Sequence, residues 1–220
     1  MDMWGIFIGL VIGAYLLASI PFGRVVGKRI KGLDITKVGS GNIGAANVAR
    51  EVGLAWGIIT LLADALKGFI PVAAVVYLLG PSPEIKEVLK GLVGLAALLG
   101  HQFPVYNRFK GGKGVATCLG VFLAISPISC LFSGTIFLVV VALWRYISLG
   151  SMAAALSMPG WLSIGGHSDI LIITSMAISF LIVFRHRDNI QRLVKGNERR
   201  WHIRGNHDSR SIRRPSSSSE

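Results

Sequence analysis

The stretch "VATCLGVFLAISPISC", residues 115–130, decides how the helices of this chain are counted. Residues 115–126 are apolar, but they are too few for a helix that crosses a hydrocarbon core, which takes roughly 20 residues. Pro127 breaks or kinks a continuous helix at this point, and a new apolar segment begins at residue 128. Two separate helices here place the rest of the chain on the opposite side of a membrane from a single merged helix.

The composition of the whole chain favours repeated membrane spans over a soluble fold. Of its 220 residues 52% are hydrophobic and 15% are charged, and the mean hydropathy is +0.59. The first apolar segment lacks a basic flank before it and a small-residue cleavage site after it, so it is expected to be retained as a span. The apolar segments lie at residues 4–23, 54–79, 88–103, 115–126, 128–144, 149–164 and 170–184.

The distribution of basic residues decides between the possible counts. We count seven spans and place the N-terminus outside. The Lys and Arg residues then number six, three, one and ten in the inner segments 24–53, 104–114, 145–148 and 185–220, respectively. These are twenty of the 23 Lys and Arg residues in the chain. This asymmetry is what the positive-inside rule predicts. Merging the two segments around Pro127 would place the basic C-terminal tail outside. We therefore predict an all-α integral membrane protein of seven transmembrane helices, with its C-terminus and polar loops on the cytoplasmic side.

The chain is expected to form one membrane domain, residues 1–196, followed by a basic, disordered cytoplasmic tail at residues 197–220. The net charge of +12 raises the question of nucleic acid, but no soluble domain is available to carry a basic face, and we expect no nucleic-acid partner. Cys118 and Cys130 lie in apolar segments, without metal-ligand spacing. We expect them to be small core residues, and we expect no metal site.

The first inner loop reads "VGSGNIGAANVAR", residues 38–50. Its glycines permit tight turns and close backbone approach to a ligand, and the run 45–50 is suited to open a short helix whose N-terminus would attract phosphate. A purely structural loop is equally compatible with this pattern. The candidate ligand-binding residues are Gly39, Ser40, Gly41, Asn42, Asn47 and Arg50.

The second inner loop contains "RFKGGKGVAT", residues 108–117. Lys110 and Lys113 flank Gly111 and Gly112, and Gly114 leads into the next helix. Two lysines that merely fix membrane orientation would explain the charges but not three glycines. The pattern therefore favours an anion site at the membrane surface, where the glycine backbone can expose its N–H donors. Lys110, Gly111, Gly112 and Gly114 are candidate phosphate-binding residues, and Lys113 is the cation expected to touch the ligand.

Two further groups of polar residues lie at or within the spans. In "FRHRDNIQRL", residues 184–193, His186 and Asn189 are three apart and share a helix face. Asp64 and Lys67 lie inside the second span, where an unpaired charge is costly. They are compatible with a buried ion pair and with a supporting role at the substrate site. Together the inner elements predict an anionic, phosphorylated ligand; a transporter for such a solute or a membrane scaffold are the alternatives to an enzyme.

Six motifs together resemble the bacterial acyl-phosphate:glycerol-3-phosphate acyltransferases over residues 10–196. They are "SIPFG" (19–23), "GSGNIGAANVAR" (39–50), "DALKGFIP" (64–71), "GHQFPVYNRFKGGKGVAT" (100–117), "RYISLGS" (145–151) and "RHRDNIQRLVKG" (185–196). The resemblance implies a seven-helix, multi-pass enzyme of the bacterial inner membrane. Its substrates would be acyl phosphate and glycerol 3-phosphate, and its product would be lysophosphatidic acid. This reaction is the first step of phospholipid synthesis. The enzyme would be surrounded by membrane lipid. It would need no cofactor.

The same resemblance assigns catalytic roles to Ser40, Arg50, Lys113, His186 and Asn189. Ile43 and Ala46 depart from the family pattern, which has proline and threonine there. Acyl phosphate is already activated, so positioning and charge stabilisation can supply the catalysis. We expect direct transfer without an acyl-enzyme, with His186 or a substrate phosphate oxygen taking the proton.

Overall fold

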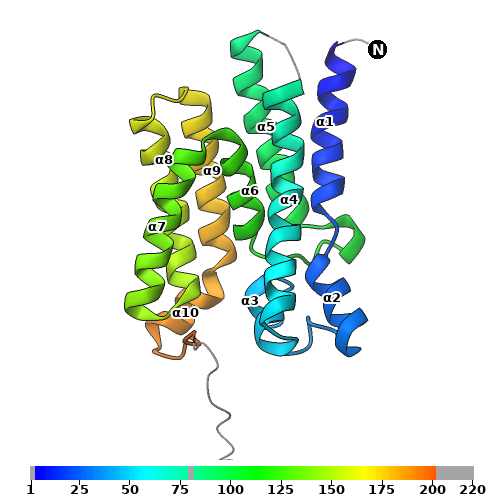
Figure 1. The fold of residues 1–220 in the computed structure, drawn as a ribbon, viewed down its shortest axis with the longest axis vertical. Helices are drawn as coiled ribbons and strands as arrows, with labels where there is room; N and C mark the ends of the chain where they lie inside the picture. The colour runs from blue at the N-terminus through cyan, green and yellow to red at the C-terminus, as the bar shows by residue number, and fades with distance from the viewer. Residues whose placement is uncertain (1–2, 79–81, 202–220) are drawn as a thin grey trace, which may run out of the picture.

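The computed structural model describes residues 3–78 and 82–201, and its regular structure there is helical. The seven apolar segments of the sequence each form a helix (Figure 1). These long and intermediate helices are α1 (Met3–Ala18), α4 (Leu54–Leu78), α5 (Pro83–Gln102), α6 (Val115–Ile125), α7 (Pro127–Trp144), α8 (Ile147–Ile164) and α9 (Asp169–Arg185). Shorter elements connect or follow them: α2 (Phe22–Lys31), α3 (Ala45–Glu51), η1 (Val105–Asn107) and α10 (Arg187–Val194).

Five helical stretches among the described residues are long and apolar enough to cross a membrane, and a sixth is obtained when α9 and α10 are taken as one bent span. The remaining apolar helix, α6, has 11 residues and would reach only about 17 Å at 1.5 Å per residue. The prediction of an all-helical membrane protein is therefore confirmed, whereas length alone does not establish α6 as a seventh span.

The break that the sequence predicts at Pro127 is present. Helix α6 ends at Ile125 and α7 begins at Pro127, the first-turn position where proline is tolerated. The side chain of Ser126 caps α7 by accepting a hydrogen bond from the backbone N–H of Ser129, at 3.4 Å. The two apolar segments are thus separate helices.

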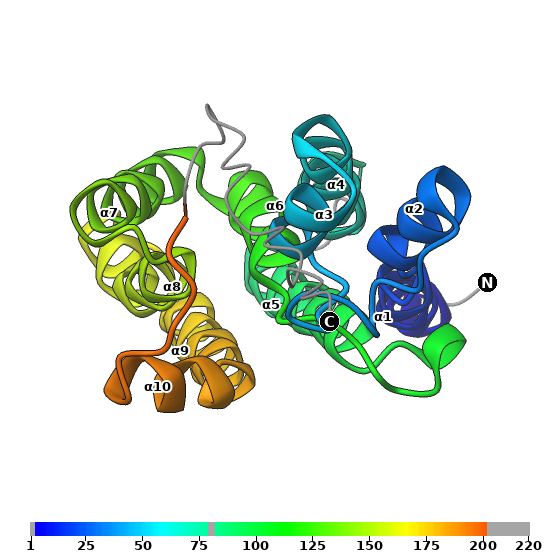
Figure 2. The ribbon, with the colours of Figure 1, turned by 90° about the horizontal axis from the view of Figure 1, so that it is seen from below.

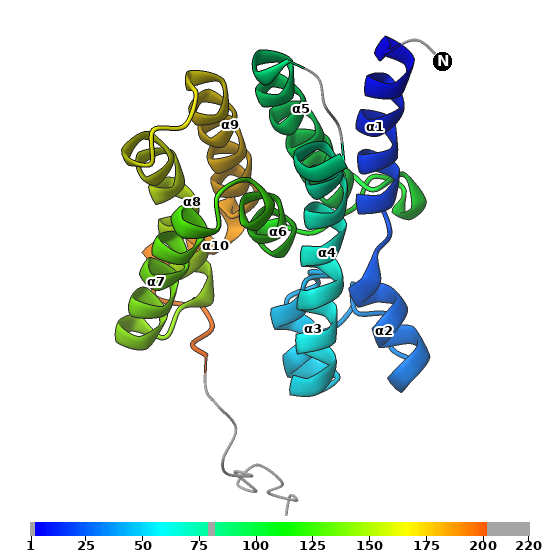
Figure 3. The same ribbon diagram turned by 45° about the horizontal axis from the view of Figure 1, so that its top comes forward.

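The helices form two groups with α6 between them, as Figures 2 and 3 show. Helices α1, α4 and α5 pack on one side, and α7, α8 and α9 on the other. One apolar core lies among α1, α4, α5 and α6, and a second includes residues of α5 to α9. The short polar helices α2, α3 and α10 gather at one end of the bundle, opposite the end where α1 begins (Figure 1).

The surface of the bundle carries many large apolar side chains, and small or polar residues lie among the buried ones. Large apolar side chains such as Leu131 and Phe180, each 68% exposed, point outward. Buried serines occupy helix contacts, where small residues allow close approach and hydroxyls bond across or along helices; Ser179, for example, donates to the carbonyl of Ala155 in α8 at 2.5 Å. Cys118 and Cys130 are free and buried, as expected.

Glycines allow α4 and α6 to approach each other closely. A Cβ atom at Gly120 of α6 would stand 1.9 Å from the carbonyl oxygen of Ala65 in α4, and one at Gly68 of α4 would stand 2.1 Å from the carbonyl oxygen of Thr117 in α6. These distances exclude any side chain. The two glycines therefore set the position of α6, and with it the loop that precedes it.

We predict that Gly120→Ala destabilises the fold by pushing α6 away from α4. Overpacking of this kind costs about 1–3 kcal/mol, so thermal unfolding of the detergent-solubilised protein should occur several degrees lower. Gly9→Ala is the matched control, because a Cβ atom there has no neighbour within 4 Å. Equal unfolding temperatures for the two variants would contradict this packing.

Candidate active site

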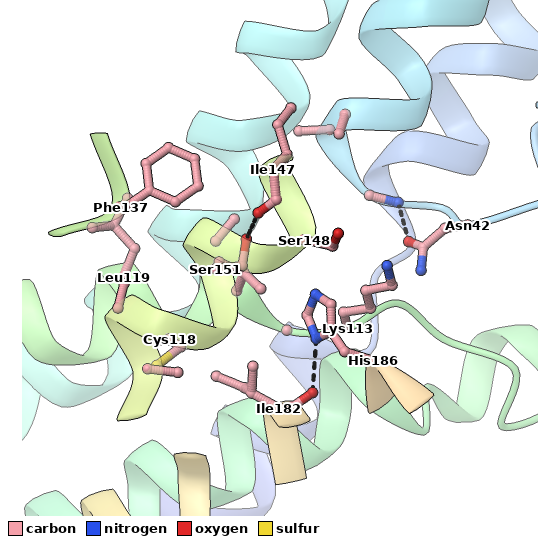
Figure 4. A pocket seen from close by; sticks show the side chains of 18 of the residues that line it. Asn42, Lys113, Cys118, Leu119, Phe137, Ile147, Ser148, Ser151, Ile182 and His186 are labelled. Atoms are coloured by element: carbon pink, nitrogen blue, oxygen red, sulfur yellow. Dashed lines mark hydrogen bonds between the residues drawn. The ribbon is translucent and has the colours of Figure 1, made fainter. Parts of the chain in front are cut away.

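A cavity of about 510 Å³ lies between the two groups of helices, a volume typical of small-molecule sites. Its polar end is formed by the two loops, the start of α8 and the junction of α9 and α10. From this polar end, an apolar arm of the cavity extends between α6, α7 and α8 (Figure 4). Apolar side chains that line this arm are Cys118, Leu119, Phe122, Phe137 and Met158.

The first loop is shaped by the buried side chain of Asn47 in α3. Its amide nitrogen donates to the carbonyls of Ile35, Val38 and Asn42 at 3.0–3.2 Å, and its oxygen accepts from the N–H of Ser40 at 2.9 Å. The sequence predicted a phosphate contact for Asn47, but in this structure the hydrogen bonds of its amide all go to the loop. Asn47 thereby fixes the backbone on which Ser40 stands.

Two glycines of this loop adopt backbone conformations that favour glycine. Gly39 and Gly41 have φ of +61° and +69°, and a Cβ atom at Gly39 would stand 2.3 Å from Oδ1 of Asn47. The side chain of Asn42 accepts from the N–H of Gly44 at 2.8 Å, just before α3 begins. The short helix predicted for residues 45–50 is thus present, and its first residues line the cavity.

The glycines of the second loop pack closely against the end of α5. A Cβ atom at Gly111 would stand 2.2 Å from the carbonyl oxygen of His101, and one at Gly112 would stand 2.2 Å from the His101 ring. Gly114 has φ of +85° and immediately precedes α6. The N–H of Gly112 donates to the carbonyl of His101 at 3.2 Å, so it is not free for a ligand as the sequence reading supposed.

Side chains from α5 and α9 hold this loop in place. Arg185 donates to the carbonyls of Gly111 and Gly112 at 2.9 and 3.2 Å, and Gln102 donates to the carbonyl of Lys113 at 2.9 Å. Arg185, the last residue of α9, therefore also fixes the backbone of the second loop. Lys110 is exposed and is not among the described residues that line the cavity, so its predicted phosphate contact has no support in this geometry.

Lys113 points into the cavity and donates to Oδ1 of Asn189 in α10. Burial is the main reason that its pKa is lowered to about 8. The nearby Glu198 opposes this shift in pKa, while Arg192 and Arg50 add to it. The second loop and the α9–α10 junction, 76 residues apart in sequence, are thus joined at one charged group.

His186 lies beside Lys113 in the cavity (Figure 4). Its Nδ1 is 2.8 Å from the carbonyl oxygen of Ile182, which can only accept, so Nδ1 carries the proton and a neutral ring keeps its lone pair on Nε2. Burial, followed by the charge of Lys113, lowers the pKa of His186 to about 4. The imidazole is therefore neutral at neutral pH and is a hydrogen-bond acceptor.

Asp64 and Lys67 form the buried ion pair anticipated as one of two alternatives. Lys67 Nζ is 2.8 Å from Asp64 Oδ1, and both side chains are 3% exposed or less. Lys67 also donates to the carbonyl of Ile20 at 3.0 Å, which ties α4 to the end of α1. Asp64 and the buried His101 line the cavity, so this pair lies directly behind the second loop.

Several polar residues that line the cavity were not predicted, among them Ser148, Arg192, Glu198 and Arg199. The carboxylate of Glu198 accepts from Ser148, Asn189 and Arg192 at 2.6, 2.6 and 2.8 Å. Glu198 and Arg199 belong to residues 197–201, the described beginning of the predicted tail; residues 202–220 lie outside the described part. An Arg-rich segment with few apolar residues carries no sequence signal for such contacts.

Comparison with known proteins identifies close relatives. The family model for glycerol-3-phosphate acyltransferase matches residues 8–196. The glycerol-3-phosphate acyltransferase of Geotalea daltonii is 49% identical over 189 residues, covering 86% of this chain and 94% of the relative. That of Aquifex aeolicus is 45% identical over 192 residues, covering 87% and 97%.

Two solved structures have the same fold. A crystal structure of PlsY (YgiH), an integral membrane glycerol 3-phosphate acyltransferase, in its glycerol 3-phosphate form, superposes with a TM-score of 0.84 at 44% identity. The match covers 89% of this chain and 96% of that one. The lysophosphatidic acid form of the same enzyme gives a TM-score of 0.81 at 43% identity. A family match over most of the chain, together with this fold, shows that the chain belongs to the glycerol-3-phosphate acyltransferase family and is an acyltransferase of lipid biosynthesis.

Proposed function

We propose that this enzyme transfers a fatty acyl group from acyl phosphate to the 1-hydroxyl of glycerol 3-phosphate, directly and without an acyl-enzyme. The hydroxyl oxygen attacks the acyl carbon, and the bond from that carbon to the phosphate oxygen breaks. The products are inorganic phosphate and lysophosphatidic acid. The glycerol 3-phosphate and lysophosphatidic acid forms of the PlsY relative support the acceptor and the product.

One observation carries the proposal: a single cavity joins a cationic end to an apolar arm. The polar end brings Arg50, Lys113 and Arg192 together from three separate elements, which suits two phosphates that would otherwise repel each other. The arm follows α8 from Ser148 to Met158, roughly 15 Å at 1.5 Å per residue. That length suits a long fatty chain.

Individual roles follow from where the groups lie. Lys113 and Arg50 balance the phosphate charges, and the first turn of α6 after Gly114 adds backbone N–H donors to the same end of the cavity. Ser40 and Asn42 line the same cavity and are suited to bind phosphate oxygens. Asn189 holds the ammonium of Lys113 through its amide oxygen.

The proton of the attacking hydroxyl goes to a substrate phosphate oxygen in this proposal. The ordinary second pKa of a phosphate monoester is about 6, above the pKa of about 4 for His186, so the phosphate is the stronger base. The neutral His186 accepts a hydrogen bond from the glycerol through Nε2 and orients it. Of the two proton acceptors considered from the sequence, the proposal therefore selects the substrate phosphate oxygen and not His186.

The enzyme is proposed to cross the bacterial inner membrane seven times, with the N-terminus outside. The asymmetry of basic residues supports this orientation, and so does the gathering of α2, α3 and α10 at one end (Figure 1). Helix α6 is proposed to make the fourth crossing, starting from the cytoplasmic loop at residues 104–114, whose backbone is held by α5 and α9. Both phosphorylated substrates then reach the cavity from the cytoplasm, and the acyl chain lies within the bilayer.

We predict that purified enzyme in detergent forms lysophosphatidic acid and inorganic phosphate in equal amounts from palmitoyl phosphate and glycerol 3-phosphate. Palmitoyl-CoA and palmitoyl-acyl carrier protein should give at most a few percent of that rate, because the cationic end is matched to a phosphate on the acyl carbon. Product formation with either thioester at a rate comparable to the acyl phosphate would contradict the proposed donor.

We predict that Lys113→Ala lowers kcat/KM by about 10²–10³, the typical effect of removing a donor that stabilises developing charge. Since the charged form of Lys113 is required and its pKa is about 8, wild-type kcat/KM should fall as the pH rises through about 8. The control is Lys37→Ala, at an exposed lysine just before the first loop, and it should keep the wild-type rate. A wild-type profile that stays flat to pH 10 would exclude this role.

We predict that Gly134→Leu shifts the preference toward shorter acyl chains. Gly134 of α7 lines the cavity, and a Cβ atom there meets nothing within 4 Å, so the added side chain fills the arm without disturbing the helices. The ratio of kcat/KM for palmitoyl over octanoyl phosphate should fall about tenfold or more, as a difference of one or more methylenes allows. Gly9→Leu, at an equally open position in α1, should leave the ratio unchanged; an unchanged ratio for Gly134→Leu would disprove the acyl arm.

A further inference from the structure

The segment after α10 doubles back across the polar end of the cavity. Residues 198–201, here called the C-terminal strap, contact three separate parts of the site. Arg199 donates to the carbonyl of Gly39 in the first loop at 3.1 Å. The N–H of Trp201 donates to the carbonyl of Arg145 at 2.6 Å, and the guanidinium of Arg50 stands 5.8 Å from the centroid of its ring. The strap thus connects the first loop with the α7–α8 connection.

The strap is anchored by the carboxylate of Glu198, whose side chain is 7% exposed. One oxygen accepts from Ser148 and from Nδ2 of Asn189, and the other accepts from Arg192. Desolvation would raise the pKa of Glu198, but the hydrogen bonds from these three side chains outweigh it and lower the pKa below its usual value. The carboxylate is therefore ionised wherever the enzyme is assayed near neutral pH.

The amide of Asn189 stands between Glu198 and Lys113, and this fixes its orientation. An ammonium can only donate and a carboxylate can only accept. The amide must therefore turn its oxygen to Lys113 and its nitrogen to Glu198, which is the arrangement present. With a neutral partner in place of Glu198, which can both donate and accept, the amide would be oriented by the ammonium alone and would lose the charged acceptor for its nitrogen.

We propose that Glu198 is a positioning residue for acyl transfer: it fixes the Asn189 amide so that Lys113 is held toward the substrates, and it anchors the strap across the site. This inference rests on the roles proposed above for Lys113 and Asn189. It goes beyond them because Glu198 acts through its neighbours, without a bond to substrate.

The charge of Glu198 gives the proposal a specific signature in the pH profile. It favours the protonated form of Lys113, so its loss should move the pKa of Lys113 below about 8. The alkaline fall in kcat/KM should then begin at a lower pH. The other charged or titratable groups that face Lys113 are unchanged in the test: Arg50 from α3, and His186, Asp188 and Arg192 at the α9–α10 junction.

The test compares wild type, Glu198→Gln, Glu198→Asp and the control Glu84→Gln, an exposed carboxylate at the start of α5. Each variant is assayed with the acyl donor that the wild-type enzyme is found to use. A failure of the proposed acyl phosphate donor is then distinguished from a failure of the role proposed for Glu198. We expect Glu198→Gln to lose about ten- to a hundredfold in kcat/KM, the range for a hydrogen bond to a charged group, with an alkaline limb shifted to lower pH. Glu198→Asp should recover part of the rate and the wild-type limb.

Three results would overturn the proposal. The first is a Glu198→Gln enzyme with the rate and pH profile of Glu84→Gln. The second is equal loss in both Glu198 variants with an unshifted limb in the residual activity, which would mean a merely structural role. The third is a lower KM for glycerol 3-phosphate together with faster turnover in Glu198→Gln, which would mean that the carboxylate competes with a substrate phosphate.

Discussion

The contact between the ammonium of Lys113 and the amide of Asn189 is the interaction on which the site depends. It joins the loop before α6 to the α9–α10 junction, and so it connects the two groups of helices at the polar end of the cavity. Since Lys113 is largely buried, its charge is held at a cost in desolvation, and this cost appears as a pKa near 8. An anionic group in contact with Lys113 would offset part of that cost, and this is the physical basis of the proposed phosphate contact.

Glycine makes this contact geometrically possible. Gly68 and Gly120 bring α6 against α4, and Gly111 and Gly112 bring the second loop against the end of α5. These positions are closed to any side chain, so the position of Lys113 is set by the packing of backbone on backbone. The acidic and basic groups behind the loop, Asp64 and Lys67, compensate each other, whereas Lys113 turns its charge to the cavity.

Much of the fold could be predicted from the sequence because a membrane imposes simple constraints. Apolar length located the helices, and Pro127 correctly separated α6 from α7. Several motifs in a fixed order predicted the family, which the family match confirms. The family in turn favoured an enzyme over a transporter or a scaffold. Ser40, Arg50, Lys113, His186 and Asn189, predicted from distant segments, all line one cavity.

Other features could not be predicted because they depend on three-dimensional partners. Nothing in the sequence indicates that the amide of Asn47 makes four hydrogen bonds to backbone groups, or that the amide oxygen of Asn42 accepts from the N–H of Gly44. The second-loop glycines looked like a source of free N–H groups, but one of these groups is bonded to α5. Glu198 and Arg199 were assigned to a disordered tail because their segment has few apolar residues, and the sequence gives no sign of the polar contacts that both make at the site.

The central claim is that both substrates meet in one cavity and react directly. The measurement that tests it most directly is intact-protein mass spectrometry after incubation with palmitoyl phosphate alone, paired with rapid-quench detection of phosphate. Direct transfer predicts no acylated protein and no burst of phosphate until glycerol 3-phosphate is added. A stoichiometric palmitoyl adduct on the enzyme, formed with a phosphate burst in the absence of glycerol 3-phosphate, would contradict it.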